Sequence, residues 1–280
     1  MNQSVSFADQ ILSSPPEATA PVPQGLRYII ATSQRTGSTL LGDGLASTGV
    51  AGTPDEWFVP GAGGDAVLKR QFGCVGDADY IDQVIRGTAT PNGVFGTKLF
   101  WQQWDSLIPK LIAKTNHPAD RPMRDILPEL LTTGLGSPIK YIWLRRRNTV
   151  AQAISLYRAQ NTGVWRSIAG RADQDTVVDR ELPFDFDGIA VHMQRIEEVD
   201  RKWISYFRSY RISALMLFYE DFVANYEETV RGVLKFLGLS YEDVIVSPPK
   251  LERQADARSQ EWEERYRERV GNLKETVDGL

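Results

Sequence analysis

A run of small, hydroxyl and amide residues with one arginine follows the first apolar stretch of this 280-residue chain. The run is Ser33, Gln34, Arg35, Thr36, Gly37, Ser38 and Thr39, and it leads into an apolar-periodic helix from about 38 to 48. Backbone N–H groups at a helix N-terminus attract anions, and neighbouring hydroxyl groups add hydrogen bonds. Arg35 adds a positive charge at the same place. The run therefore predicts an anion site, with an ordinary capped strand-to-helix turn as the alternative.

A second basic feature follows another apolar stretch. Three consecutive arginines, Arg145, Arg146 and Arg147, precede a helix from about 149 to 160 that carries Ser155. Ser155 lies about two helical turns into that helix, so it can converge with one of these arginines on a single phosphate. A solvated basic cluster is the alternative. Taken with the first run, this pattern predicts a nucleotide that carries phosphate at both ends.

Nucleotide triphosphatases are the main competing class. Their loop requires G-x-x-x-x-G-K-[ST], and the first glycine and the lysine are both missing here. They also place an acidic magnesium ligand near a strand end, where this chain has arginines. The two histidines, His117 and His192, and the single cysteine, Cys74, show no zinc or nucleophile spacing. We therefore expect no metal site, and we expect Cys74 to be a packing residue.

The candidate binding residues must be brought together by the fold. Helical patterns alternate with β-rich apolar runs, which cover 27–32, 93–99, 139–144 and 212–218. This alternation predicts a parallel sheet covered on both faces, with ligands beyond the carboxyl ends of its strands. Since no linker divides the chain, we expect a flexible tail over 1–25 and one α/β domain over 26–280, with a central parallel sheet flanked by helices.

The amino-acid composition bears on which partners the protein can bind and on the compartment in which it is found. A net charge of −4 argues against broad binding to nucleic acid, because such binding needs a basic surface. The first two dozen residues are rich in Pro, Ala and Ser, and they lack the continuous apolar stretch of a signal peptide or membrane span. A single cysteine fits a reducing compartment. We expect a cytoplasmic protein without a membrane span.

Several segments together resemble a known family. The loop over 33–41 resembles the 5'-phosphosulfate loop of carbohydrate sulfotransferases, and the element from Arg146 and Arg147 to Ser155 resembles their 3'-phosphate site. More narrowly, the chain resembles the bacterial trehalose 2-sulfotransferase family, with supporting segments at 49–52, 55–58, 91–99, 152–155 and 251–259. The resemblance implies a P-loop-like sulfotransferase fold and a homodimer. It also implies 3'-phosphoadenosine 5'-phosphosulfate (PAPS) as sulfuryl donor, with PAP as product.

The resemblance assigns a general base. Glu56 matches the family's catalytic glutamate, which removes the proton of the acceptor hydroxyl as its oxygen attacks sulfur. Taken alone, the residues over 53–56 favour a helix-capping box with proline at the first helical position, and the resemblance reverses that preference. Arg35 and Lys98 are expected to assist the reaction, Lys98 because it lies near a strand end, although a solvated lysine is its alternative. Arg253 is expected at the nucleotide.

The acceptor implied by the resemblance is a sugar hydroxyl. We expect Thr53, Asp55 and Trp101 beside it, with Trp101 as an apolar platform. Thr53 replaces a glutamate of the trehalose enzymes, so the acceptor is trehalose or a related glycoside or glycolipid. The alternatives outside this class are a kinase-like phosphotransferase and a catalytically silent PAP-binding module.

Overall fold

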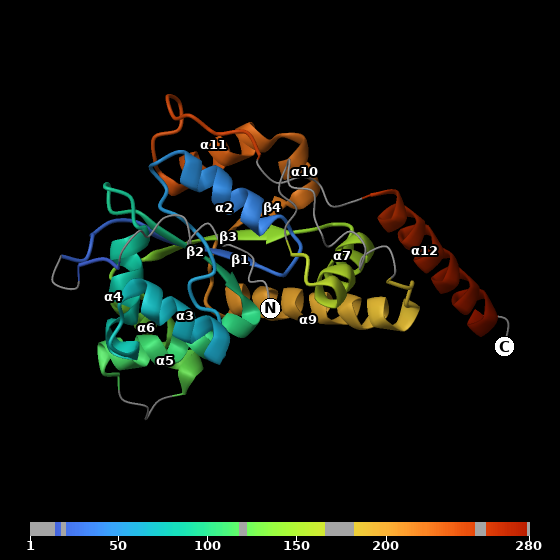
Figure 1. Cartoon of the computed structure of the whole chain (residues 1–280), viewed down its shortest axis with the longest axis horizontal. Coiled ribbons are helices and arrows are strands. Elements are labelled where there is room, and N and C mark those ends of the chain that lie inside the picture. Colours follow the sequence, from blue (N-terminus) through green and yellow to red (C-terminus); the bar gives the residue numbers. More distant parts are fainter. Residues whose placement is uncertain (1–14, 18–20, 118–121, 166–181, 250–255, 279–280) are drawn as a thin grey trace.

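Four parallel strands form one sheet at the centre of the molecule, in the order β2-β1-β3-β4. In this computed structural model the strands are β1 (Arg27–Thr32), β2 (Phe95–Phe100), β3 (Ile139–Arg145) and β4 (Leu215–Phe218). Helices cover both faces of the sheet (Figure 1). This arrangement confirms the predicted α/β fold with a central parallel sheet.

The structure describes residues 15–17, 21–117, 122–165, 182–249 and 256–278. Most of the predicted tail at 1–25 and the predicted nucleotide contact Arg253 lie outside these residues. Within the described part, no helix has the length and apolar content needed to cross a membrane.

The strand register brings the loops that carry the predicted site residues to the same end of the sheet, the carboxyl ends of its strands. Thr32 at the end of β1 lies level with Phe100 in β2 and with Leu144 in β3. The chain leaves β1 towards β2 and later crosses back to β3, so the strand order switches between β1 and β3. Ligands of such sheets bind beyond this switch point. The predicted loop after β1 and the arginines after β3 flank it.

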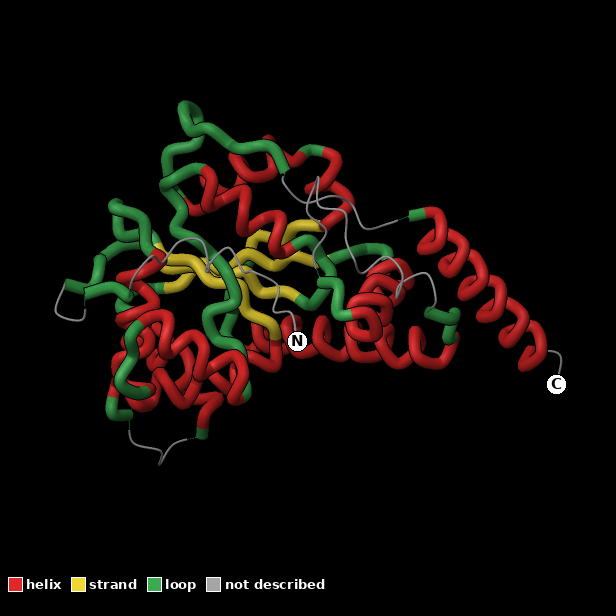
Figure 2. The backbone as a smooth tube through the Cα atoms, viewed as in Figure 1, coloured by secondary structure: helices red, strands yellow, loops and turns green. Residues whose placement is uncertain are grey.

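Alternating side chains of β1 anchor the two faces of the sheet. Tyr28 and Ile30 point to one face, where α2 (Ser38–Ser47), α10 (Tyr219–Ala224) and α11 (Tyr226–Leu237) complete the core. Ile29 and Ala31 point to the other face. The elements that cover it, seen as the lower layer in Figure 2, are α3 (Ala62–Phe72), α4 (Asp77–Thr88), α5 (Trp104–Thr115), α6 (Met123–Leu135) and α9 (Phe186–Ser209). Both faces are therefore buried, as a parallel sheet requires.

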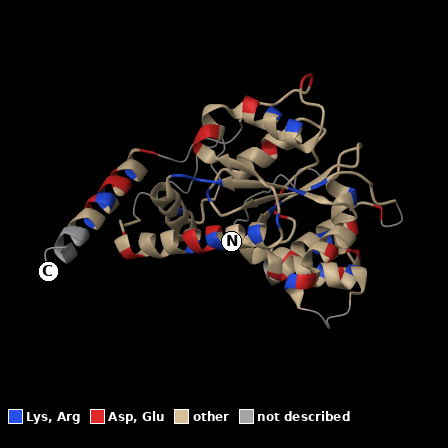
Figure 3. Cartoon of the chain, turned by 180° about the vertical axis from the view of Figure 1, so that it is seen from behind, with Lys and Arg blue, Asp and Glu red and all other residues tan. Residues whose placement is uncertain are grey.

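A third apolar cluster joins three helices beside the sheet. It lies between α7 (Thr149–Thr162), α9 and α12 (Ala257–Asp278), and it buries Tyr157, Ile189, Trp262 and Tyr266. From this cluster α12 leads away from the sheet (Figure 1). Figure 3 shows acidic and basic residues interspersed along the helices, α12 included.

Two interpretations that rest on local sequence pattern alone were wrong. No helix begins at the predicted capping box, because Asp55 pairs with Thr97 of β2 as a parallel bridge and the next helix, α3, begins at Ala62. The last strand begins at Leu215 and not at Ile212, because Arg211 adopts a left-handed φ of 52° in the preceding turn. The bounds predicted for the first strand, 27–32, match β1.

Candidate active site

The loop after β1 has the backbone shape of an anion cradle. Arg35 and Gly37 both adopt left-handed conformations, with φ of 65° and 82°. Left-handed residues thus stand on both sides of Thr36, which does not have a positive φ. A backbone that alternates between the two hands turns successive N–H groups towards one side. Gly37 also allows a close approach, since a Cβ atom there would lie 2.7 Å from the ring of Tyr219. The first turn of α2, which follows, contains no acidic residue and its N-cap makes no side-chain hydrogen bond. An anion suits these N–H groups.

Buried hydroxyl and amide groups hold this loop in place. Thr32 Oγ1 lies 2.6 Å from Thr36 Oγ1, and both side chains are fully buried. Gln152 of α7 donates from Nε2 to Ser33 Oγ at 2.9 Å and to the Gln34 carbonyl oxygen at 2.7 Å. The loop shape is therefore fixed by both β1 and α7.

Arg35 reaches from this loop to the second predicted anion site. Its Nε donates to Ser155 Oγ at 2.9 Å, and its Nη1 donates to the carbonyl oxygen of Trp165 at 2.6 Å. Burial, and then the like charges of Arg146 and Arg158, lower the pKa of Arg35 to about 10. A bound anion would offset both effects. The two phosphate elements predicted separately thus meet in one basic cluster, formed by Arg35, Arg146, Arg158 and Ser155.

The three consecutive arginines point in different directions. Arg145 bonds Asp200, with the closest pair of atoms 2.7 Å apart. Arg147 makes two 2.6 Å hydrogen bonds to Asp221, and its side chain is 49% exposed. Arg146 is only 11% exposed, lies over the ring of Tyr219 and donates to the Arg35 carbonyl oxygen at 3.4 Å. Of the two arginines predicted at the 3'-phosphate, Arg146 therefore faces the loop.

Two members of this site were not predicted. Gln152 and Arg158 lie three residues before and three residues after Ser155 on α7. Residues at this spacing share one side of a helix, and that spacing was the signal that could have identified them. Arg158 also bonds both carboxylate oxygens of Asp256, at 2.7 and 2.8 Å, and so ties this side of α7 to the start of α12.

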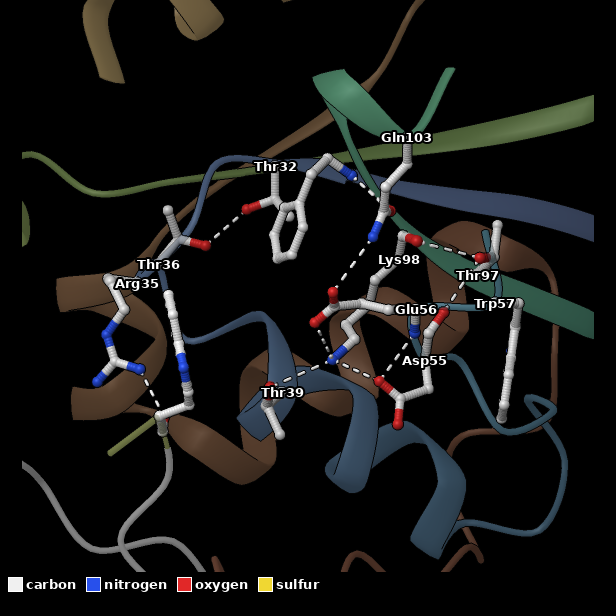
Figure 4. A network of polar contacts seen from close by, with 12 residues as sticks. Thr32, Arg35, Thr36, Thr39, Asp55, Glu56, Trp57, Thr97, Lys98 and Gln103 are labelled. Carbon is white, nitrogen blue, oxygen red and sulfur yellow. Dashed lines mark hydrogen bonds and ion pairs between the residues drawn. The ribbon is translucent and has the colours of Figure 1, made fainter. Parts of the chain in front are cut away.

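A carboxylate lies beside a buried lysine at the neighbouring strand end (Figure 4). The segment containing Asp55 and Glu56 runs along the outer edge of β2, because the Asp55 carbonyl oxygen accepts from the Lys98 N–H at 2.9 Å. Lys98 is 1% exposed, and its Nζ lies 2.7 Å from Asp55 Oδ1 and 3.7 Å from Glu56 Oε1. Lys98 is thus a buried member of an ion-pair group and not a solvated lysine.

The same lysine connects the carboxylate to the first turn of α2, which follows the loop after β1. Lys98 Nζ donates to Thr39 Oγ1 at 3.2 Å, and Thr39 lies in the first turn of α2. Gly42 of α2 permits the close packing, since a Cβ atom there would lie 2.6 Å from the Pro54 carbonyl oxygen. Glu56 Oε2 accepts from Gln103 Nε2 at 3.2 Å, a partner that was not predicted. These contacts bring Glu56, Lys98 and the loop into one network.

The residues expected at the acceptor are partly engaged elsewhere. Thr53 donates from Oγ1 to the Thr88 carbonyl oxygen at 3.1 Å. Trp101 packs edge-on against Trp203 and Tyr206, with ring centroids 5.1 and 6.4 Å away, in the aromatic core below the sheet. Asp55 Oδ1 accepts from the Glu56 N–H at 2.8 Å as well as pairing with Lys98. In this structure Thr53 therefore forms a hydrogen bond within the fold, and Trp101 packs in the core.

Arg258 and Cys74 both make packing contacts within the described part of the chain. Arg258 donates to the Leu182 carbonyl oxygen and lies over the ring of Trp262, so it helps attach α12. Cys74 packs against the main core, and burial raises its pKa to about 12. The described residues contain no cluster of three or more His, Cys, Asp or Glu side chains that could hold a metal ion.

Comparison with known proteins gives a consistent result over most of the chain. The model of the Stf0 sulphotransferase family matches residues 27–269. Trehalose 2-sulfotransferase of Mycolicibacterium smegmatis is 34% identical over 266 residues, which cover 86% of this chain and 94% of that protein. Trehalose 2-sulfotransferase of Mycobacterium tuberculosis is 29% identical over 269 residues, covering 88% and 96%.

Among solved structures, a sulfotransferase from Alicyclobacillus acidocaldarius aligns with a TM-score of 0.41 and 11% identity, over 91% of this chain and 96% of that chain. The family match includes the loop after β1, the Glu56 segment and the arginines after β3. On the extent of that match and the identity to the two curated relatives, this chain belongs to the Stf0 sulphotransferase family.

Proposed function

We propose that the protein transfers a sulfuryl group from PAPS to a hydroxyl group of a carbohydrate, with Glu56 as general base. Family membership supports sulfuryl transfer, and the curated relatives support a carbohydrate acceptor. The observation that carries the mechanism is the chain of contacts from Thr39 Oγ1 to Lys98 Nζ and on to Glu56 Oε1, at 3.2 and 3.7 Å. It connects an anion loop to a carboxylate.

The basic cluster suits a donor that bears phosphate groups at two positions. The N–H groups of the loop after β1 and of the first turn of α2 would hold the phosphosulfate end. Arg146, Arg35 and Ser155 would hold the 3'-phosphate through charge-assisted hydrogen bonds. The lowered pKa of Arg35, which arises from burial and then from its arginine neighbours, supports this assignment because an anion would neutralise that crowding.

Glu56 and Lys98 then have separate tasks. The acceptor oxygen forms a bond to sulfur while the bond from sulfur to the bridging phosphate oxygen breaks. The acceptor proton moves to the Glu56 carboxylate, whose side chain is 32% exposed and so accessible to a sugar. Lys98 would stabilise the negative charge that develops on the departing phosphate oxygen. PAP and the sulfated sugar are the products.

A sulfuryl-transfer assay tests the proposal. The protein would be incubated with PAPS and a panel of carbohydrates beginning with trehalose, with mass detection of the sulfated product. Thermal shifts with PAP, ATP and ATP-magnesium would run in parallel. We expect a sulfated sugar and stabilisation by PAP without metal. Stabilisation by ATP-magnesium alone would favour a phosphotransferase, and PAP binding without turnover on any carbohydrate would favour a silent module.

The Glu56→Gln variant tests the assigned base. The amide keeps the shape of the side chain but cannot take up the acceptor proton, so kcat should fall by about 10²–10⁴-fold. PAP affinity, measured by calorimetry, should stay close to that of the wild type because Glu56 does not belong to the basic cluster. A kcat near the wild-type value in a folded variant would remove Glu56 from this role.

A further inference from the structure

We propose that Gln103 is a positioning residue that orients the Glu56 carboxylate and holds it in its ionised form. This inference rests on the proposed function, because it concerns the base assigned above. Gln103 closes the 3-10 turn η1 (Trp101–Gln103) that follows β2, and its side chain is 2% exposed. Its Nε2 donates to Glu56 Oε2 at 3.2 Å, as Figure 4 shows.

The orientation of the Gln103 amide is fixed by the backbone. Gln103 Oε1 accepts a hydrogen bond from the Phe100 N–H at 3.0 Å. A backbone N–H group can only donate, so the amide oxygen must face Phe100 and the amide NH₂ group must face Glu56. The end of β2 thereby aims a hydrogen-bond donor at the carboxylate.

The two oxygens of the carboxylate consequently have different partners. Glu56 Oε1 lies 3.7 Å from Lys98 Nζ, and that lysine is closer to Asp55, at 2.7 Å. Lys98 is therefore shared between two carboxylates, whereas Gln103 directs a neutral donor to Oε2. The charged groups around Glu56 in these contacts are Lys98 and Asp55. A donor to the ionised form stabilises that form and restricts its rotation.

This arrangement answers a problem of the mechanism. A general base must be ionised and aimed at the acceptor when the proton leaves. Glu56 lies in an irregular segment between the bridge at Asp55 and the start of α3, so no helix or strand fixes its side chain. Hydrogen bonds from a buried, rigid neighbour supply that fixation. Gln103 provides one from a different element of the fold.

The test is the pH dependence of kcat/KM in the full chain, with PAPS and the sugar that gives turnover. In Gln103→Glu, one new carboxylate oxygen can still accept from Phe100 while the other faces Glu56. Two neighbouring carboxylates bind a proton more tightly. The acid limb of the kcat/KM profile, where activity falls as the base becomes protonated, should therefore move up by at least about one pH unit. Gln103→Met removes the donor at similar size and should move the limb upward by less, with a lower kcat.

Gln102 provides a matched control. It is exposed in the same turn, so Gln102→Glu adds the same charge nearby without the contact and should leave the acid limb unchanged. PAP affinity should stay unchanged in all variants. If Gln103→Glu does not fold, the position of the acid limb in Gln103→Met tests the positioning role of Gln103. Loss of rate by the same factor at every pH, or an unchanged profile in Gln103→Met, would overturn the inference.

The Glu56→Gln variant separates the two proposals. If Glu56→Gln turns over at the wild-type rate, then the assignment of the base fails and this inference fails with it. If Glu56→Gln loses turnover while the Gln103 variants keep the wild-type acid limb, only the positioning role of Gln103 fails.

Discussion

The Nε atom of Arg35 donates a 2.9 Å hydrogen bond to the Oγ atom of Ser155, across 120 residues of sequence. Arg35 lies in the loop after β1 and Ser155 lies on α7 after β3, so the contact spans the switch point of the sheet. A residue of the proposed phosphosulfate loop thus contacts the residue expected at the 3'-phosphate. The two halves of the proposed donor site form a single hydrogen-bonded unit.

Substitutions at these two positions should consequently depend on each other. We expect Arg35→Ala to weaken PAP binding by about 1.5–3 kcal/mol through loss of a charge-assisted contact, and Ser155→Ala to weaken it by about 1 kcal/mol. The loss in the double variant should differ from the sum of the single losses by more than about 0.5 kcal/mol, because contacting residues couple. Isothermal titration calorimetry of the four proteins measures this. Additive losses, or unchanged affinity in both single variants, would contradict the shared unit.

We expect Lys98 to contribute to the stability of the fold as well as to the proposed reaction. Lys98→Met leaves the Asp55 carboxylate buried without its closest cationic partner, which is 2.7 Å away. Breaking a buried pair by removal of one member costs about 3–5 kcal/mol, so the free energy of unfolding in urea should fall by about that amount. A stability within about 1 kcal/mol of the wild type would show that the pair contributes little.

The matched control for this prediction is the double variant with Asp55→Asn. It removes the buried negative charge together with the positive one, and the amide can still accept from the Glu56 N–H. We expect the double variant to recover much of the stability lost in Lys98→Met, without recovering turnover. Recovery of both properties would restrict Lys98 to a structural role.

The attachment of α12 should depend on acid pH. Hydrogen bonds from Arg158, together with the Ser259 N–H, hold the pKa of Asp256 below its usual range. A depressed carboxyl pKa adds stability that is present above the unfolded-state value of about 3.9 and is lost as pH falls towards the folded-state value. Asp256 is half-exposed, so solvent screening limits the contribution to under about 1 kcal/mol.

Urea unfolding of wild type and Asp256→Asn measures this contribution. The difference in unfolding free energy should be present at pH 7 and should shrink as the pH falls from about 4 to 2. Glu261→Gln is the control, because Glu261 forms an exposed pair with Arg265 on the outer side of the same helix. It should change stability by less than Asp256→Asn at pH 7. A constant difference across the whole pH range would exclude the ion pair as its cause.

The local sequence pattern was enough to predict the parallel sheet and the loops at the carboxyl ends of its strands. Each strand has its own run of apolar residues, and each loop follows its strand directly in the sequence. The pattern did not predict how those loops meet. Whether Arg146 or Arg147 faces the loop after β1 depends on Asp221, which lies 74 residues after Arg147 and binds it. The contact of Gln103 with Glu56 likewise depends on the turn after β2.

The capping box shows the opposite case, in which a correct local pattern is overruled. Thr53, Pro54, Asp55 and Glu56 have the residue types of a helix start, yet Asp55 pairs with the edge of β2 and its carboxylate with Lys98. Backbone hydrogen bonds to a strand and a buried ion pair outweigh a cap that contributes about 1 kcal/mol. Only the long-range contact determines which of these occurs.

The last prediction concerns the acceptor. Thr53 donates to the carbonyl oxygen of Thr88, so its short neutral side chain is directed towards the end of α4. A glutamate at this position is longer and cannot donate to that carbonyl group, so its carboxylate would turn away and could accept two hydrogen bonds from sugar hydroxyl groups. We therefore expect Thr53→Glu to raise kcat/KM for trehalose relative to glucose and simple glucosides.

The comparison uses competition between trehalose and a glucoside, with mass detection of both sulfated products. Thr53→Gln is the control, because it has the same length without the charge and should give a smaller change. A change of about tenfold corresponds to about 1.4 kcal/mol, which is within the range of one charge-assisted hydrogen bond. An unchanged ratio in a folded Thr53→Glu protein would separate this position from acceptor choice, and transfer confined to phenols would refute the sugar assignment itself.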